Sequence, residues 1–239
     1  MSVIWKQNDR GQSEESQIRP AGALYSGTMH RLLNALQSSD LIAAANAGRG
    51  GVFVIGSRMR RILASDTSWI VSYSKRWLKS LADETGETCF VARLFGTSIR
   101  SVVMESPSAS VGVYVTPGYA LPPHASATGK VLTAMQDQPQ RDAILQAELQ
   151  RLTDKTILDR AALEAEYTRI RQQGFASEFG EHAQGLSSIA CPILLSDGEP
   201  PIYALGLTGP SERVNRAAME GFLPRLQAVA AEVSRGFAL

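Results

Sequence analysis

The chain has 239 residues, of which 44% are hydrophobic and 20% are charged, so it can bury a sizeable core and is neither a disordered chain nor a small disulfide-stabilised scaffold. Its 24 Lys and Arg nearly balance 23 Asp and Glu, and a net charge of +1 neither favours nor excludes a nucleic-acid partner. The distribution is more informative, because residues 1–64 carry 8 basic and 4 acidic side chains and form a basic N-terminal part ahead of an acidic remainder.

Cysteine usage and hydropathy indicate the compartment. Cys89 and Cys191 are the two cysteines of the chain and both have apolar neighbours, which predicts buried free thiols in a reducing environment. No stretch approaches the roughly 20 apolar residues that a bilayer span requires. We therefore expect a cytoplasmic protein without a membrane partner, a metal site or a cofactor.

The N-terminal part begins without a clear periodicity. Residues 1–22 are polar, and we expect them to be weakly ordered. Residues 26–36 form the first amphipathic helix, with Ser26 as its N-cap. Its predicted apolar stripe is Met29, Leu32, Leu33 and Leu36, and its opposite face presents Thr28, His30 and Arg31.

Two short apolar runs, 40–43 and 51–56, follow this helix and predict a β-hairpin with a glycine-rich tip that contains Arg49. A helix followed by a hairpin with a cationic tip is the layout of the second half of a winged helix-turn-helix, in which Arg49 contacts phosphate. An ordinary surface hairpin with a solvated arginine explains the same pattern equally well.

The remainder predicts an α+β domain with an antiparallel sheet flanked by helices. A long helix over 67–84 is ended by Gly86. The predicted strands are 88–95, 100–105, 112–116, 188–195 and 202–208, and the predicted helices are 126–136, 140–151, 160–173 and a C-terminal helix around 222–233.

Residues 121–130 contain the clearest candidate binding segment. Two prolines lead into a small-residue loop that opens a helix at Ser126. Exposed N–H groups at such a helix start bind carboxylates and other anions, although simple capping by Ser126 is an equal alternative. The segment matches neither a Walker A loop nor an SxxK motif.

Residues 174–190 form a second candidate segment, which we interpret as a loop that leads into a buried strand. Glu178 or Glu181 with His182 could act as an acid/base or metal pair, but a hydrogen-bonding role is the more common use of such a histidine. The chain has no HExxH motif and no GxSxG nucleophile elbow. We therefore expect no enzymatic activity.

Several segments, in this order, resemble the IclR family of bacterial transcriptional regulators, and the resemblance covers roughly residues 24–237. The matching segments are 26–33, 121–132, 174–192 and 204–210. The resemblance implies an N-terminal winged helix-turn-helix that binds operator DNA, a linker helix, and a C-terminal GAF-like domain that binds a small effector. It also implies a homodimer or a dimer of dimers.

Site residues follow from the same resemblance. It implies DNA contacts from Ser26, Thr28, His30, Arg31 and Arg49. It implies an effector pocket lined by Val113, Leu121, Ala127, Thr128, Glu178, Ser188, Gly206 and Thr208. Such a pocket suits a small carboxylate or aromatic acid. Some relatives have Asp in place of Glu178 and Cys in place of Ser188, so the longer acid here narrows the cavity or selects an effector hydroxyl.

The expected domains are a DNA-binding domain over 1–64, with an atypical segment over 1–23, the start of the linker helix over 65–75, and an effector-binding domain over 76–239. Pro20 and the few apolar residues before Ser26 do not resemble the family's supporting helices. The expected function is an effector-responsive regulator that senses a small organic or aromatic acid. The alternative is a dimeric small-molecule-binding module whose DNA binding is impaired.

Overall fold

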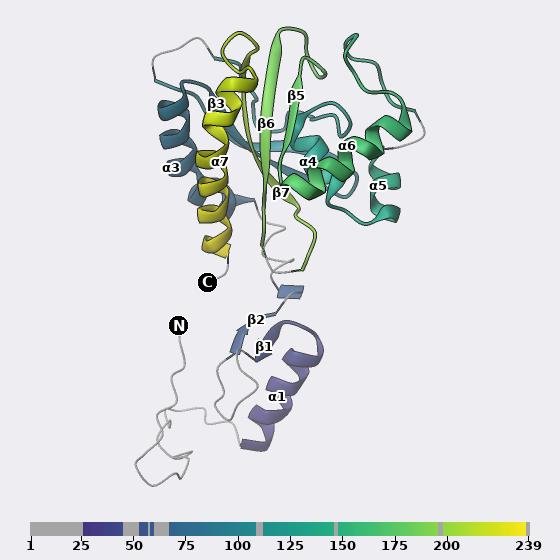
Figure 1. Ribbon diagram of the computed structural model, residues 1–239. Coiled ribbons are helices and arrows are strands. Elements are labelled where there is room, and N and C mark those ends of the chain that lie inside the picture. Colours follow the sequence, from purple (N-terminus) through teal and green to yellow (C-terminus); the bar gives the residue numbers. More distant parts are fainter. Residues whose placement is uncertain are drawn as a thin grey trace. The chain divides into compact units, whose positions relative to one another are not determined.

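The computed structural model describes residues 26–44, 53–56, 58–59, 67–108, 112–145, 148–195 and 198–237. The chain divides into two compact units, Met1–Asp66 and Thr67–Leu239. Figure 1 shows the elements of both units.

The described part of the first unit contains helix α1 (Ser26–Ser38) and an antiparallel pair of strands, β1 (Ile42–Ala44) and β2 (Phe53–Ile55). Ile42 is paired with Ile55, and Ala44 with Phe53. The predicted hairpin is confirmed, while its tip with Arg49 lies outside the described residues.

The apolar stripe of α1 differs from the expectation. Leu33 and Leu36 are half-buried, but Met29 and Leu32 are 44% and 45% exposed. The predicted amphipathic helix is confirmed, but only the C-terminal half of its apolar stripe is partly covered. In the described part of this unit, α1 packs against β1, and a three-residue strand is too short to cover a stripe along three helical turns.

The second unit is built on a five-stranded antiparallel sheet with the order β4-β3-β7-β6-β5. Its strands are β3 (Thr88–Phe95), β4 (Ser98–Glu105), β5 (Ala176–Phe179), β6 (Leu186–Ile193) and β7 (Tyr203–Pro210). Its helices are α3 (Ser68–Thr85), α4 (Ala127–Ala134), α5 (Gln138–Leu145), α6 (Arg160–Gln173) and α7 (Arg216–Phe237). The predicted α+β class is confirmed.

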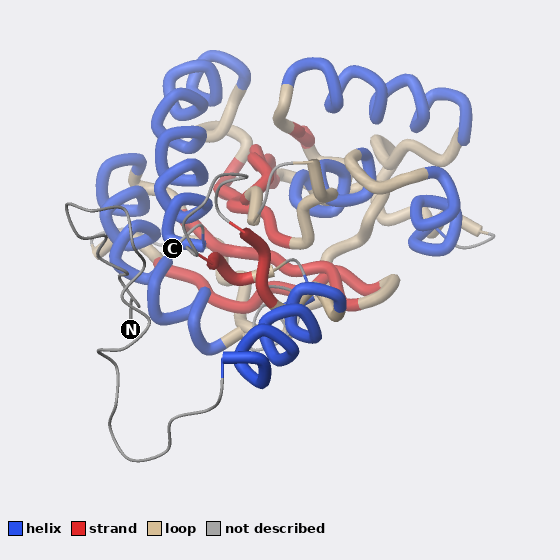
Figure 2. Tube along the Cα trace, turned by 90° about the horizontal axis from the view of Figure 1, so that it is seen from below, coloured by secondary structure: helices blue, strands red, loops and turns tan. Residues whose placement is uncertain are grey.

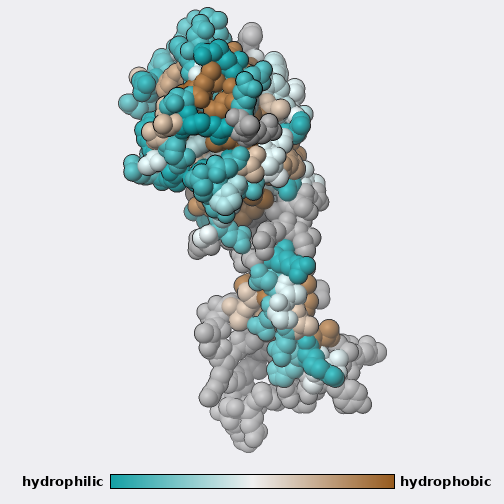
Figure 3. Space-filling model, turned by 90° about the vertical axis from the view of Figure 1, so that its right-hand side faces the viewer, coloured by the Kyte–Doolittle hydropathy of each residue, from teal (hydrophilic) through white to brown (hydrophobic). Residues whose placement is uncertain are grey.

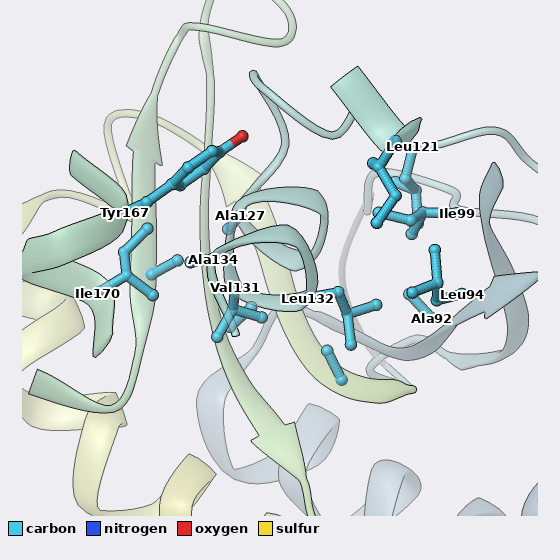
Figure 4. Close-up of a cluster of buried hydrophobic side chains, with 14 of the residues drawn as sticks. Ala92, Leu94, Ile99, Leu121, Ala127, Val131, Leu132, Ala134, Tyr167 and Ile170 are labelled. Carbon is cyan, nitrogen blue, oxygen red and sulfur yellow. The ribbon is translucent and has the colours of Figure 1, made fainter. Parts of the chain in front are cut away.

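Helices cover both faces of the sheet (Figure 2). Helices α3 and α7 pack together on one face, and α4 lies on the other face against β5, β6 and β7. Helices α6 and α5 then pack against α4. Every residue of α4 is buried, and Figure 4 shows its side chains between those of α6, such as Tyr167, and those of the sheet, such as Leu94. The exposed side of this unit drawn in Figure 3 is mostly hydrophilic around one apolar area.

Helix ends agree well with local sequence signals. Gly86 and Gly174 end α3 and α6 in the left-handed conformation, with φ of 72° and 78°, which glycine adopts without steric cost. Asp159 begins α6 by accepting the N–H of Ala162 at 2.7 Å. An ion pair between Glu84 and Arg225 links α3 to α7.

Three predicted elements need correction. Residues 112–116 form no strand, because the edge of β4 is hydrogen-bonded to the following loop, in which the N–H of Leu121 reaches the carbonyl of Ile99. Helix α5 ends at Leu145, and residues 148–151 are not helical. The segment interpreted as a loop contains strand β5, which escaped the pattern because its inward position 178 is a glutamate. Among the described helices, none is long and apolar enough to cross a membrane.

Candidate functional site

A row of four polar side chains crosses the sheet on the face covered by α4. Strand pairing places Glu178 of β5 opposite Ser188 of β6, Ser188 opposite Thr208 of β7, and Thr208 opposite Thr88 of β3. Directly paired residues point to the same side of a sheet, so the four side chains form one line about 14 Å long, at three strand spacings. We call these residues the polar row.

The neighbouring row explains how closely α4 approaches the sheet. It consists of Ala176, Ala190, Gly206 and Phe90, which are paired in the same way. A Cβ atom at Gly206 would lie 2.8 Å from Cγ2 of Thr128 and 2.7 Å from the ring of Phe90. Glycine is therefore required at position 206, and it brings the first turn of α4 down beside the polar row.

The first turn of α4 has its own polar groups inside the protein. The hydroxyl of Ser126 accepts the N–H of Gly129 at 3.1 Å and donates to the carbonyl of Pro122 at 2.8 Å. Simple capping by Ser126 is therefore present. It satisfies one of the first backbone N–H groups, and those of Ala127 and Thr128, at the first two helical positions, have no intrahelical acceptor. The positive end of the helix dipole adds to their attraction for an anion.

Two of the buried hydroxyl groups that lack a hydrogen-bond partner among the described residues belong to the polar row or to the first turn of α4. They are Oγ1 of Thr88, at one end of the polar row, and Oγ1 of Thr128, on the first turn of α4. Both threonines are at most 1% exposed. Buried polar groups are nearly always paired, and an unpaired one costs about 1–3 kcal/mol. These two hydroxyls are therefore candidates for hydrogen bonds to a ligand.

Glu178 is 1% exposed at the opposite end of the polar row. Its Oε1 lies 2.8 Å from the hydroxyl of Ser188, and its Oε2 accepts the backbone N–H of Glu181 at 2.9 Å. The hydroxyl of Ser188 in turn lies 3.0 Å from that of Thr208. Burial raises the pKa of Glu178 to about 7, against the opposing effect of these hydrogen bonds.

Glu181 fixes the turn after β5 through contacts with Lys130 and Thr156. Its carboxylate pairs with Nζ of Lys130 on α4 at 2.9 Å, and its carbonyl accepts the hydroxyl of Thr156 at 2.9 Å. Lys130 is fully buried and also contacts Glu166 of α6 at 3.3 Å. Two carboxylates compensate the buried ammonium group, so the turn is fixed relative to α4 and α6.

His182 does not form an acid/base pair with a glutamate side chain. Its backbone N–H, at 3.4 Å, is the group that faces Glu178, and its ring Nε2 lies 3.4 Å from the hydroxyl of Tyr119. Burial, with a smaller effect from His124, lowers the pKa of His182. Within the described ranges, no three His, Cys, Asp or Glu side chains are arranged to hold a metal ion.

The structure brings most of the expected effector residues together. Glu178, Ser188 and Thr208 share one hydrogen-bonded chain, and Thr128 contacts the strand at Gly206. Leu121 and Ala127 belong to the adjoining apolar cluster (Figure 4). Val113 is half-buried, and its neighbour Gly112 approaches the hydroxyl of Thr88, where an added Cβ would lie 3.0 Å from it.

Thr88 was not anticipated as a site residue. Strand periodicity alone places it on the same face as Phe90, but its position beside Thr208 becomes visible only with the pairing of β3 and β7. In the first unit, His30 and Arg31 are exposed and Thr28 is half-buried. Ser26 is the first residue of α1, and Arg49 lies outside the described residues.

Comparison with known proteins identifies the class of protein. The family model for the C-terminal part of the bacterial transcriptional regulator IclR matches residues 64–235. The chain therefore belongs to the IclR family of transcriptional regulators, as the sequence motifs predicted. The similar proteins are named as regulators and not as enzymes.

Three relatives illustrate the match. The HTH-type transcriptional regulator TtgV of Pseudomonas putida is 32% identical over 189 residues, 79% of this chain and 71% of TtgV. A crystal structure of an IclR-type regulator from Silicibacter has a TM-score of 0.68 and 26% identity over 90% of this chain and 84% of its own. The inducer-binding domain of a PobR double mutant from Acinetobacter, in complex with 3-hydroxybenzoic acid, has a TM-score of 0.63 and 28% identity over 69% of this chain and 97% of its own.

Glu178 predicts a pH dependence of stability. Folding raises its pKa from the usual 4.5 to about 7, so its contribution to stability is complete below about pH 4.5 and is lost as the pH rises to about 7. Relative to Glu178→Gln, which does not titrate, the free energy of unfolding of the wild type should fall by about 3 kcal/mol across this range. Urea unfolding of both proteins at a series of pH values measures the difference, and parallel curves would contradict the assignment.

Proposed function

We propose that the chain is an effector-responsive transcriptional regulator whose second unit senses a small organic or aromatic acid at the polar row. The observation that carries this proposal is that the hydroxyls of Thr88, at the end of the polar row, and of Thr128, on the first turn of α4, are buried without a hydrogen-bond partner among the described residues. In this proposal residues 1–64 form the DNA-binding domain, 65–75 begin the linker helix, and 76–239 form the effector-binding domain.

The polarity of the site gives the ligand an orientation. Its carboxylate accepts hydrogen bonds from the hydroxyl of Thr128, the first N–H groups of α4 and the hydroxyl of Thr88. Its distal polar group faces Ser188 and Glu178, away from the anion-binding end. Val113, Leu121, Ala127 and Gly206 contribute apolar surface for the body of the ligand, and Thr208 lies between the two polar ends. The complex of the PobR domain with 3-hydroxybenzoic acid supports an aromatic acid of this size.

Thr88 offers a route from the ligand to the linker helix. It follows Gly86, the residue that caps α3, by two positions. The intervening Glu87 is buried and forms two hydrogen bonds with Arg213, at 2.5 and 3.0 Å. A ligand that forms a hydrogen bond with Thr88 therefore contacts a residue two positions after the cap of α3, and Arg213 fixes the position of the intervening Glu87. This connection is the route by which we propose that the effector biases DNA binding.

In the first unit, we propose that α1 reads operator DNA through Ser26, Thr28, His30 and Arg31, and that Arg49 contacts phosphate. The exposure of His30 and Arg31 supports this role, as does the basic character of residues 1–64. A homodimer or a dimer of dimers would place two such helices on a two-fold operator.

A second candidate function is a ligand-binding dimeric module with impaired DNA binding. The observation that favours it is the exposure of Met29 and Leu32 on α1. A reading helix depends on a packed core to fix its orientation in the groove. DNA-binding measurements separate the two candidates, because only the first predicts discrimination between operator and scrambled DNA.

Thr128→Val should change stability and ligand affinity in opposite directions. The substitution keeps the shape of the side chain but removes an unpaired buried hydroxyl, so the unliganded protein should become more stable by up to about 1 kcal/mol. Affinity for 3-hydroxybenzoate should fall by about tenfold, because a hydrogen bond to a carboxylate is lost. Thermal unfolding and isothermal titration calorimetry measure the two effects.

The matched control is Thr116→Val, the same substitution at an exposed position, which should alter neither quantity. If Thr128→Val left ligand affinity unchanged while the protein bound the acid, the ligand would lie elsewhere. If the unliganded protein lost stability, the hydroxyl would already have a structural partner.

Arg31→Gln tests the DNA-reading helix. Loss of one base or phosphate contact should weaken binding to the DNA upstream of the gene by about tenfold or more. Fluorescence anisotropy with that duplex and a scrambled duplex, over a series of salt concentrations, measures affinity and specificity together. Gln37→Ala, exposed near the end of the same helix, is the control. Equal, salt-sensitive binding of the wild type to both duplexes would favour the second candidate function.

A further inference from the structure

We propose that Glu178 becomes partly protonated when an anionic ligand binds at the polar row, so that binding of the acid anion is coupled to the uptake of a fraction of a proton. This inference rests on the proposed function, because it concerns the same pocket. It adds that the response of the protein to its effector depends on pH near neutrality. The argument is made from the partners of Glu178, the hydroxyl chain beside it and the surrounding charges.

The hydrogen-bond partners of Glu178 within the described residues are all neutral. They are the hydroxyl of Ser188 and the backbone N–H groups of Glu181 and His182. The carboxyl group is 1% exposed, so water does not stabilise its charge. A carboxylate buried among neutral donors is readily protonated when a second negative charge arrives.

The hydroxyl chain beside Glu178 accommodates either charge state. In one arrangement the hydroxyl of Thr208 donates to the carbonyl of Ser187 at 3.3 Å and the hydroxyl of Ser188 donates to Thr208 at 3.0 Å. Each hydroxyl has one proton, so the 2.8 Å contact between Ser188 and Glu178 then requires the proton to be on the glutamate. In the other arrangement the chain reverses, and Ser188 donates to an ionised Glu178. A proton from solvent can thus be added without moving a heavy atom.

Other charged groups near Glu178 compensate one another and do not supply a counter-charge. On the turn and on α4, Glu181 pairs with Lys130. On α6, Glu166 contacts Lys130 and also pairs with Arg169. This set holds two positive and two negative charges and leaves no excess cation for Glu178. Lys155, whose Nζ lies beside Gly180 on the same turn, is not among the hydrogen-bond partners of Glu178 within the described residues.

The two histidines of this unit, His124 and His182, supply no positive charge to Glu178 near neutral pH. Burial is the largest effect that lowers the pKa of His124 and of His182, so both are neutral above their usual range. On strands β6, β7 and β3, the side chains that lie in line with Glu178 are Ser188, Thr208 and Thr88, and all three are neutral. Among the described groups at the polar row, Glu178 is the carboxyl group whose hydrogen-bond partners are all neutral, and it is therefore the group that we propose takes up the proton.

The size of the effect follows from the dimensions of the row. A ligand carboxylate bound near Thr128 and Thr88 lies roughly 10–14 Å from Glu178, at two to three strand spacings. At an effective dielectric constant of about 20, two negative charges at this distance change the ionisation constant of Glu178 by about tenfold. The dissociation constant of the anion should be constant while Glu178 is protonated in both states. It should rise by about tenfold once Glu178 ionises in the unliganded protein.

The test is isothermal titration calorimetry of the full chain with 3-hydroxybenzoate, from about pH 6 to about pH 8.5, in phosphate and in Tris. The wild type should lose about tenfold in affinity over this range, and its apparent binding heat near pH 8 should differ between buffers because a fraction of a proton is taken up from them. Glu178→Gln should bind with the same affinity at every pH and the same heat in both buffers. A glutamine side chain can keep the contacts with Ser188 and the turn, and thermal unfolding checks that this variant is folded.

His182→Gln is the matched control, on the same turn, and should keep the pH dependence of the wild type. Wild-type binding that is independent of pH and buffer would overturn this inference while leaving the proposed function intact. A pH dependence that survives in Glu178→Gln would also overturn it, since another group such as Glu181 would then take the proton. Failure to bind 3-hydroxybenzoate, 4-hydroxybenzoate or benzoate at any pH would contradict both the inference and the proposed ligand class.

Discussion

The close approach of α4 to the sheet at Gly206 is the constraint on which the site depends. No side chain at position 206 would leave space for Thr128 and the ring of Phe90. Because α4 is buried along its whole length, its first turn opens toward the interior of the protein and not toward solvent. The polar groups of that turn must then be paired inside, and the polar row beside it offers the groups that do so.

Because α4 is buried, its charged side chain also needs partners inside the protein. Lys130 lies on the inward side of α4, and its ammonium group is held by Glu181 and Glu166. Glu181 also donates its backbone N–H to Glu178. The same residue thus connects the structural charge network to the polar row. The network stabilises the position of the turn, while the hydroxyls of Thr88 in the row and of Thr128 on α4 remain available to a ligand.

Much of the fold could be predicted from local signals, because capping and periodicity act within a few residues. Gly86 and Gly174 ended their helices as expected. Long-range pairing could not be predicted in this way. A glutamate at an inward position hid strand β5, and Thr88 joined the site only through its pairing with Thr208. Family resemblance, and not spacing, supplied Glu178, Ser188 and Thr208 as neighbours, and the exposed Met29 and Leu32 of α1 departed from an otherwise correct helical pattern.

A crystal structure of the full chain grown with 3-hydroxybenzoate would test the central claim most directly. The account predicts one ligand per chain on the α4 face of the sheet, with its carboxylate oxygens about 3 Å from the hydroxyl of Thr128 and the first N–H groups of α4. Its ring should lie over Gly206, and its phenol group should point toward Ser188 and Glu178. A ligand bound away from the polar row, or a row filled by side chains with Thr88 and Thr128 paired to protein groups, would contradict it.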